Sequence, residues 1–350
     1  MKNKRIHQSS GVTIVEVLFS IGIIVTGLLG VAGLIMVAGT QMTQGLEADA
    51  MSNAGLNAIA EFETRNMQNP NNLVWFDPDP KINQFRLLTP KFILGKSFCI
   101  DPFFIAQQQL DHKLDKNFKH LSYFPSTKYP NPTISMLRVT LKDTDTNKWL
   151  PLPLSREIFI AKDDLAFSTP ASATELPEQQ WITEGFAGPK LKRTNHAEYS
   201  WLAMLTPAVE KTDHYLISIV VFKNRGVRGD LSNSEEQFFK IDFLNSGFGS
   251  GEVELSNIRL DGLYPRHGDW VMLSAATPSD NLHRWYQVTY IDEENHSEDG
   301  GTHYHRHATL QGPDWRHSGS VTQVTLIPGV VGVFEKTTRL GATSLYDKTK

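Results

Sequence analysis

Three histidines near the C-terminal end of the sequence have a spacing that could bind a metal ion. His303, His305 and His307 lie at positions i, i+2 and i+4 of the segment GTHYHRHATL, so on a β-strand their side chains would share one face. The H-x-H spacing is used by zinc and copper sites. The flanking segment is strongly polar, which also fits the exposed rim of a hairpin, and no ligand from a second element is evident. A metal site stays open as an alternative, and we expect no cofactor.

A second polar segment, DTDTNKW, has the rhythm of a calcium-binding loop, with Asp143, Asp145 and Asn147 at alternate positions. An EF-hand loop needs glycine at its sixth position and glutamate at its twelfth, where this sequence has Lys148 and Leu154. An ordinary polar turn is therefore favoured. The fingerprints of serine hydrolases, P-loop proteins, zinc proteases and dinucleotide-binding proteins do not occur. We expect a protein that is not an enzyme, with a metalloenzyme built on the histidines as an alternative.

The third chemically distinctive residue is Glu16, the only charged residue between Val12 and Gly39. The run around it is almost uniformly apolar, and at 1.5 Å rise per residue it is long enough to cross a hydrocarbon core ~30 Å thick. A carboxylate inside such a run costs roughly 2.5–3.5 kcal/mol on insertion scales. The run therefore predicts a transmembrane helix over residues 12–39, in which Glu16 needs a functional reason.

Basic residues precede this run and do not follow it closely. Lys2, Lys4 and Arg5 lie before it, and the next Lys or Arg is Arg65. The positive-inside rule then places the N-terminus in the cytoplasm and the bulk of the chain across the membrane. A cleaved secretory signal peptide would have a shorter apolar stretch and a closer cleavage site. A plain signal anchor is a further alternative, but it would not account for Glu16.

The segment GVTIVEVL, residues 11–18, resembles the signal of type IV prepilins, in which a short basic leader ends in glycine and glutamate is fifth in the mature chain. The resemblance implies that a prepilin peptidase cuts between Gly11 and Val12, and that Val12 is then N-methylated. It also implies that Glu16 meets the amino terminus of a neighbouring pilin-like subunit, which would offset the cost of burying the carboxylate. The resemblance is confined to the leader and the N-terminal helix.

The helix is expected to continue beyond the membrane. An approximate helical stripe of apolar residues runs through residues 46–62, and no proline intervenes before Pro70. After Pro70 the apolar runs shorten to strand length. The sequence thus predicts an α+β fold with a long N-terminal membrane-spanning helix and a large, mainly antiparallel β head. The expected parts are a leader (1–11), the helix (12–68) and a head in two parts (70–230 and 231–350).

Strands are expected in the head wherever a short apolar or alternating run is bounded by turn residues. The expected strands are 86–95, 133–141, 214–223, 236–244, 251–260, 269–275, 283–291 and 321–340. The segment 154–167 fits either a helix or a strand, and 168–198 is polar and rich in proline and glycine, so we expect a surface loop there. The strands after residue 235 are spaced as in a small antiparallel sheet or open barrel.

Composition limits the class of protein. A hydrophobic content of 40% with 21% charged residues argues against bulk disorder. The formal net charge is −4 and no basic stripe is present, so no nucleic-acid partner is expected. Cys99 is the only cysteine, which excludes an intrachain disulfide. The segment around it, KSFCIDPFFI, indicates a small core residue.

We interpret the sequence as a structural subunit, either a minor pilin of a type IV pilus or a pseudopilin of a type II secretion pseudopilus. The head, residues 70–350, is large beside that of a major pilin, which favours a minor subunit. The resemblance implies three partners, namely prepilin peptidase, other pilin-like subunits through the N-terminal helix, and the inner membrane, with the head in the periplasm. The alternative is a membrane-anchored envelope module that binds or adheres with its head and uses the helix only as a stem.

Overall fold

The computed structural model of the chain begins at Thr13 and has internal gaps. It describes residues 13–77, 84–89, 93, 95–112, 122–126, 134–143, 149–161, 165–168, 192–195, 199–208, 213–225, 236–244, 251–258, 263–276, 281–292, 296–297, 304–315 and 322–341. The chain divides into two compact units, Met1–Ala50 and Met51–Lys350. They are called the first and the second unit below.

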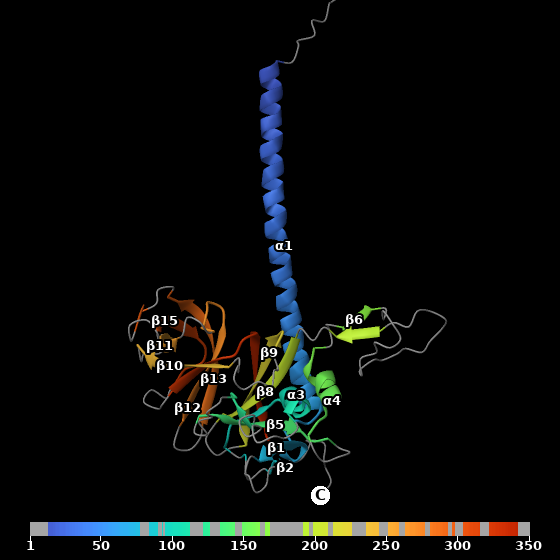
Figure 1. Cartoon of the computed structure of the whole chain (residues 1–350), viewed down its shortest axis with the longest axis vertical. Helices are drawn as coiled ribbons and strands as arrows, with labels where there is room; N and C mark the ends of the chain where they lie inside the picture. Colours follow the sequence, from blue (N-terminus) through green and yellow to red (C-terminus); the bar gives the residue numbers. More distant parts are fainter. Residues whose placement is uncertain are drawn as a thin grey trace, which may run out of the picture. The chain divides into compact units, whose positions relative to one another are not determined.

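The N-terminal helix α1 extends from Ile14 to Thr64 and contributes to both units (Figure 1). The part of α1 in the first unit is long and apolar enough to cross a membrane. Its large apolar side chains are exposed, as Phe19 illustrates with 71% of its surface accessible. The expected start of the helix at Val12 lies outside the described residues.

The helix ends at a specific backbone motif. Asn66 adopts a left-handed conformation with φ 52°, which asparagine tolerates better than most residues. The Met67 N–H donates to the Phe62 carbonyl and the Asn66 N–H donates to the Glu63 carbonyl, both at 3.0 Å. This is the hydrogen-bond pattern of a Schellman motif. The buried side chains of Phe62 and Met67 lie on either side of it, so the helix ends before residue 68, where the sequence predicted its end.

An open sheet of eight strands begins directly after this turn. Its order is β17-β9-β8-β3-β5-β1-β2, with β4 also beside β5, and only the β3–β5 pair is parallel. The strands are β1 (Leu73–Asp77), β2 (Gln84–Leu87), β3 (Phe98–Ile100), β4 (Tyr123–Phe124), β5 (Met136–Leu141), β8 (Tyr199–Pro207), β9 (His214–Lys223) and β17 (Val330–Arg339). Two short helices, α3 (Pro102–His112) and α4 (Leu152–Phe159), follow β3 and β5.

A closed antiparallel barrel follows in the chain. Its strands are β10 (Gln237–Phe243), β11 (Glu252–Ile258), β12 (Trp270–Ala276), β13 (Asn281–Ile291), β15 (Tyr304–Gln311) and β16 (Thr322–Leu326). They pair in the order β11-β10-β16-β12-β13-β15, and the β11–β15 pairing closes the ring. The two-residue strand β14 (His296–Ser297) pairs only with β15.

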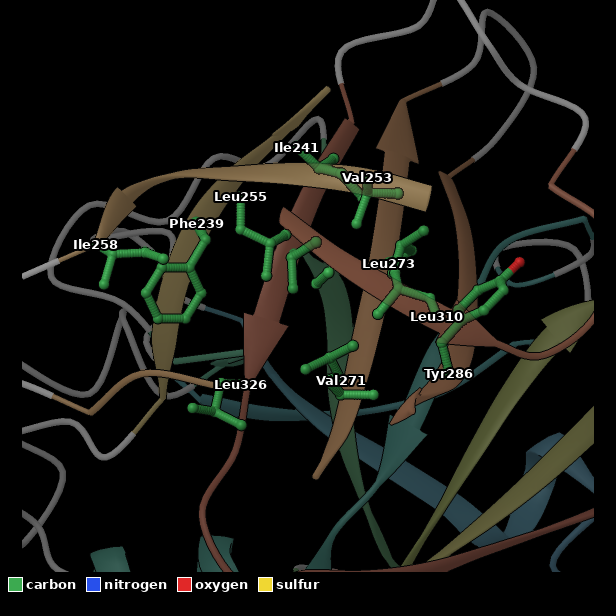
Figure 2. Packing of buried hydrophobic residues seen from close by; sticks show 13 residues of the cluster. Phe239, Ile241, Val253, Leu255, Ile258, Val271, Leu273, Tyr286, Leu310 and Leu326 are labelled. Carbon is green, nitrogen blue, oxygen red and sulfur yellow. The ribbon is translucent and has the colours of Figure 1, made fainter. Parts of the chain in front are cut away.

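Apolar side chains from all six strands fill the barrel, as expected for a barrel of this size. Figure 2 shows them converging between the strands. They are Phe239, Ile241, Val253, Leu255, Ile258, Val271, Leu273, Tyr286, Val288, Ala308, Leu310, Val324 and Leu326. The barrel interior is therefore a packed core made by side chains that alternate with outward-facing ones along each strand.

One face of the open sheet is covered by α1 and α4. Trp201, Val221 and Gly332 are opposite one another across β8, β9 and β17, so they lie on the same face. The Trp201 ring centroid lies 4.2 Å from that of Phe159 in α4. Gly332 lies against the side chain of Met51 in α1. The last turns of α1 therefore pack on this sheet.

The opposite face of the sheet carries α3 and the barrel. Arg138, Cys99 and Met204 are opposite one another across β5, β3 and β8. The Arg138 guanidinium lies 3.6 Å from the ring centroid of Phe104 in α3. Cys99 and Met204 belong to a buried apolar cluster that also contains Trp285, from the outer face of the barrel. Sheet and barrel thus share an apolar interface within the second unit.

The structure confirms the coarse fold prediction, a long apolar N-terminal helix followed by a mainly antiparallel β domain. The strand predicted at 214–223 is β9, and the predictions for 133–141, 236–244, 251–260, 269–275 and 283–291 correspond to β5 and to β10 through β13. The predicted open barrel is in fact closed by the β11–β15 pairing. Hydrogen-bonding between non-consecutive strands leaves no direct signal in local spacing, which is why the closure was missed.

Other predictions for the head need correction. The single strand predicted over 321–340 is two strands, β16 in the barrel and β17 in the sheet, separated where Gly329 adopts φ 80°. The strand predicted over 86–95 ends at Leu87. The ambiguous segment 154–167 divides into the end of α4 and the start of a small hairpin strand, β6 (Leu165–Ser168). Most of the loop predicted at 168–198 lies outside the described residues, but Lys192–Asn195 form β7, paired with β6.

Candidate functional site

Glu16 lies in the first turn of α1, where backbone N–H groups have no acceptor within the helix. Its N–H donates to the Thr13 carbonyl at 3.0 Å and lies 3.3 Å from the Thr13 hydroxyl oxygen. Thr13 is therefore the N-cap, and Glu16 lies at the third helical position, from which a glutamate side chain can complete a capping box. A carboxylate there is also favoured by the helix macrodipole. The T-x-x-E pattern could have predicted this local role from the sequence.

The other polar side chains in the apolar run are bonded within the helix. Ser20 donates its hydroxyl hydrogen to the Glu16 carbonyl at 2.8 Å, and Thr26 donates to the Gly22 carbonyl at 2.8 Å. Hydroxyls satisfied in this way fit an environment without water. Among the described residues, the Glu16 carboxylate has no hydrogen-bond or ion-pair partner. Glu16 is thus the exception among the polar side chains of the apolar run.

The predicted cleavage site cannot be placed beside Glu16, because Gly11 and Val12 lie outside the described residues. The glycines of the apolar run are described, and they have open surroundings. A Cβ atom added at Gly22, Gly27 or Gly33 would meet no atom within 4 Å. These positions leave the helix surface accessible to another helix.

The later turns of α1 have a different environment. Ala54, Gly55, Ala58 and Phe62 are buried, and their spacing places them on one helix face. A Cβ atom on Gly55 would collide with the ring of Phe334 in β17. The absence of a side chain at residue 55 therefore permits the close approach of helix and strand. At the surface beside it, Lys336 of β17 forms an ion pair with Glu63.

The histidine segment is described only in part. His303 lies outside the described residues, whereas His305 and His307 lie on β15 and alternate with residues that face the barrel core. The Nε2 atom of His307 is 3.3 Å from a Glu254 carboxylate oxygen, and its Nδ1 atom is 3.7 Å from Asp292. Within the described part of the chain, no group of three or more His, Cys, Asp or Glu side chains could hold a metal ion.

Two further predictions from the sequence have different outcomes. Cys99 is a fully buried free cysteine, which confirms its prediction as a small core residue. In the calcium-like segment the structure describes Asp143 and Trp149, and Trp149 pairs antiparallel with Lys142, whereas Asp145 and Asn147 lie outside the described residues. The residues on either side of the segment are therefore paired, and its interpretation as an ordinary polar turn stays a prediction.

Four buried charges that sequence reasoning missed lie together at the junction of sheet, α3 and barrel. They are Asp101, Arg138, Arg225 and Glu236, called the charge cluster below. Arg225 donates to both carboxylate oxygens of Asp101, at 2.9 and 2.6 Å. Arg138 lies 3.5 Å from Asp101 and 3.3 Å from Glu236. These residues are far apart in the sequence, so no local pattern could have predicted their meeting.

The charge cluster shifts the ionisation of both its acids. Burial raises the pKa of Asp101, but the charges of Arg225 and Arg138 outweigh burial and hold that pKa below its ordinary value. Burial raises the pKa of Glu236 above its ordinary value, and the two arginines and the N–H of Ser126 offset this only in part. The Ser126 N–H donates to the Glu236 carboxylate. The cluster is therefore held by charge pairing at Asp101 and is less well compensated at Glu236.

A second buried polar contact joins β12 and β13. The Ser274 hydroxyl lies 2.9 Å from Nδ1 of His283, and the two residues are paired across the strands. Burial, together with the smaller effect of the positive charge of nearby Arg284, lowers the pKa of His283 to about 3. His283 is therefore a neutral internal residue, and with 0% exposure it has no contact with solvent.

Comparisons with known proteins leave the chain without an assigned family. No family model matches the chain, and no curated protein matches it. Among solved structures, it is similar to the crystal structure of Ad16 fiber knob at 10% sequence identity, over 52% of this chain and 100% of that chain. The TM-score of that alignment is 0.09, a value that carries no argument about fold or function.

Proposed function

We propose that the chain is a structural subunit of a pilin-type filament, either a minor pilin of a type IV pilus or a pseudopilin of a type II secretion pseudopilus. The observation that carries the proposal is the Glu16 carboxylate. It lies at the start of an exposed apolar helix and has no partner among the described residues, although the hydroxyls of Ser20 and Thr26 in the same run are bonded within the helix.

A partner from outside the chain would account for this arrangement. Burying a lone carboxylate in hydrocarbon is costly, and an adjacent positive charge offsets the cost. Cleavage between Gly11 and Val12 creates an amino terminus that the neighbouring subunit can offer to Glu16. Their pairing would fix the axial register between subunits, while the glycines of the run allow the helices to approach closely.

The two environments of α1 support the same proposal. Residues in the first unit keep their apolar side chains exposed, whereas Ala54, Ala58 and Phe62 pack on the sheet of the second unit. A helix of this kind can remain in the inner membrane before assembly, with residues 12–39 in the bilayer and the head in the periplasm. The basic residues before the run favour this orientation.

Processing is the first test. Full-length protein extracted from membranes of cells that contain the prepilin peptidase should begin at Val12 and carry one added methyl group, as measured by intact-mass and N-terminal analysis. Replacing the residue at the cut, as in Gly11→Val, should leave the leader attached. A mature chain beginning near Met51 would contradict the proposal, since that terminus fits a secretory signal peptide.

Assembly is the second test, and the capping box makes the choice of variant important. Glu16→Gln removes the charge but keeps a side chain that can serve the capping box, whereas Glu16→Ala removes both. Both variants should insert and be cleaved, because the leader and the cut are intact. Both should fail to crosslink to other pilin-like subunits and should be lost from sheared filaments. Glu47→Gln, the same chemical change farther along α1, is the matched control and should assemble normally.

The two variants separate the functional role from the local one. If Glu16→Gln assembles like wild type and only Glu16→Ala fails, Glu16 serves the helix start and does not dock a neighbour. If both assemble normally, the chain is a membrane-anchored envelope module that uses the helix as a stem.

A further inference from the structure

The charge cluster lies where the chain passes from the open sheet to the barrel. Arg225 follows β9 of the sheet and Glu236 precedes β10 of the barrel. Arg225 is paired with Asp101 at the start of α3, and Glu236 is paired with Arg138 of β5 and with the N–H of Ser126 after β4. Both flanks of the connection between sheet and barrel are therefore bound to the same part of the sheet.

Stability alone does not explain a cluster of this kind. The Arg138 and Asp101 side chains are 0% exposed, and taking such charges out of water costs several kcal/mol per ion. The Nε and Nη1 atoms of Arg138 have no hydrogen-bond partner among the described residues. Apolar side chains of similar volume often stabilise a fold as well as, or better than, a buried ion pair. The hydrogen-bonded ion pairs of the cluster must therefore provide a fixed relative geometry that apolar packing does not provide.

The apolar interface beside the cluster does not fix the relative orientation of sheet and barrel by directional contacts. The sheet and barrel meet through side chains such as Met204, Phe222, Met272 and Trp285, and apolar contacts of this kind tolerate sliding better than a bidentate pair does. Sheet and barrel are otherwise separate hydrogen-bonded structures, because no barrel strand pairs with a strand of the open sheet among the described residues. Their relative arrangement therefore depends on the interface, on the charge cluster beside it and on the three-residue connection 327–329 between β16 and β17.

We propose that the charge cluster sets the arrangement of the barrel on the open sheet, and that without it the barrel opens away from the sheet while both remain folded. The bidentate Asp101–Arg225 pair supplies the direction, and the Arg138–Glu236 pair binds the first residue of the barrel segment. This inference concerns only the second unit and does not depend on the filament proposal.

The chain contains its own probe for this opening. Cys99 is the only cysteine in the sequence, and it lies in the interface between sheet and barrel. Burial raises the pKa of its thiol well above the ordinary value, so the closed form should react slowly with thiol reagents. The rate at which Cys99 of the detergent-solubilised full chain reacts with a maleimide therefore measures how often the interface opens.

The decisive variant removes one acid and one base together. Asp101→Asn with Arg225→Met keeps the cluster neutral, and asparagine can still accept the 3.4 Å hydrogen bond from the Phe104 N–H. Cys99 should react about tenfold faster or more, whereas the rate of global unfolding, followed by tryptophan fluorescence, should change much less. The matched control is Asp213→Asn with Arg339→Met, which removes an exposed pair of the same residue types. The Cys99 labelling rate of this control variant should stay within about twofold of the wild-type rate.

A second variant keeps the test decisive if the double variant does not fold. Arg225→Lys retains the charge but loses the two-pronged contact with Asp101, and it should raise the labelling rate severalfold without a matching rise in global unfolding. The proposal is overturned if the folded variants react at the wild-type rate. It is equally overturned if labelling rises only in proportion to global unfolding, since the cluster would then contribute stability and not arrangement.

Discussion

The first and second units place apolar and charged side chains in opposite ways. In the first unit, Phe19 and its apolar neighbours on α1 are exposed, and the Glu16 carboxylate has no partner among the described residues. In the second unit, apolar side chains fill the interior, and the buried side chains of Asp101 and Arg225 form an ion pair. Buried polar groups need partners wherever they lie. The second unit supplies a partner for each of these two charges, whereas the described part of the first unit supplies none for the Glu16 carboxylate.

The largest expected difference is between two phenylalanines of the same helix. Phe62 is 0% exposed, whereas Phe19 is largely exposed. Phe62→Ala should lower the free energy of unfolding of the second unit by about 3–5 kcal/mol, and Phe19→Ala should leave it unchanged. Denaturant unfolding of the full chain in detergent, followed by tryptophan fluorescence, measures the second unit alone, because every tryptophan lies at or after Trp75. Similar losses for both variants would abolish the distinction between the two parts of α1.

The next effect tests a buried polar group of the second unit. Because the pKa of His283 is lowered from 6.5 to about 3, the unfolded chain binds a proton that the folded chain excludes as the pH falls below 6.5. Stability from His283 is therefore complete above pH 6.5 and is lost toward pH 3, at about 1.4 kcal/mol per pH unit. Between pH 6.5 and about pH 4.5, wild type should lose roughly 2–3 kcal/mol more than His283→Gln does.

The matched control for this pH effect is an exposed histidine. His267→Gln changes a residue that lies at the surface. The free energy of unfolding of this variant should differ from that of wild type by close to zero over the same pH range. The measurement is denaturant unfolding at each pH with the same fluorescence signal. An unchanged pH dependence in His283→Gln would mean that His283 is hydrated in the folded protein.

The sequence allowed the helix and the general fold class to be predicted, because both depend on local patterns. Alternation identified β13, and the long apolar run identified α1. By contrast, β8 was missed because YSWLAMLTP is buried on both faces, so its apolar residues do not alternate. The three-residue strand β3 is too short to leave a periodic signal, and it exists only because β5 and β8 lie on either side of it.

The functional-site residues also divide into those with a local sequence signal and those brought together only by the fold. Glu16 could be singled out as a candidate because one carboxylate in an apolar run is visible locally, and its docking role stays a prediction. The start of α3 was equally visible, since aspartate followed by proline at Asp101-Pro102 is a helix-start signal, although we did not predict that helix. The pairing of Asp101 with Arg225 depends on chain topology across the whole sheet and has no local signature.

A smaller effect is expected from two glycines of α1. Gly55→Ala places a methyl group against the Phe334 ring and should destabilise the second unit by about 1–3 kcal/mol. At Gly45 an added Cβ atom meets nothing within 4 Å, so Gly45→Ala should only favour the helix, by about 1 kcal/mol. The tryptophan-monitored free energy should therefore fall for Gly55→Ala and remain constant for Gly45→Ala. Equal behaviour of the two variants would mean that α1 does not pack closely on β17.

The smallest expected effect concerns an exposed charge pair of the second unit, Lys336 and Glu63, whose side chains are 46% and 47% exposed. Water already solvates both groups, so their attraction is weak and is reduced further by salt. In a double-mutant cycle with Lys336→Met and Glu63→Gln, the coupling free energy should be below about 1 kcal/mol and should vanish at about 1 M salt. A coupling that exceeded this limit and survived salt would show that the contact between α1 and β17 excludes water. The Lys336–Glu63 pair and the charge cluster would then differ only in how strongly they stabilise the fold. The second unit would depend on charge pairing at its surface as well as in its interior.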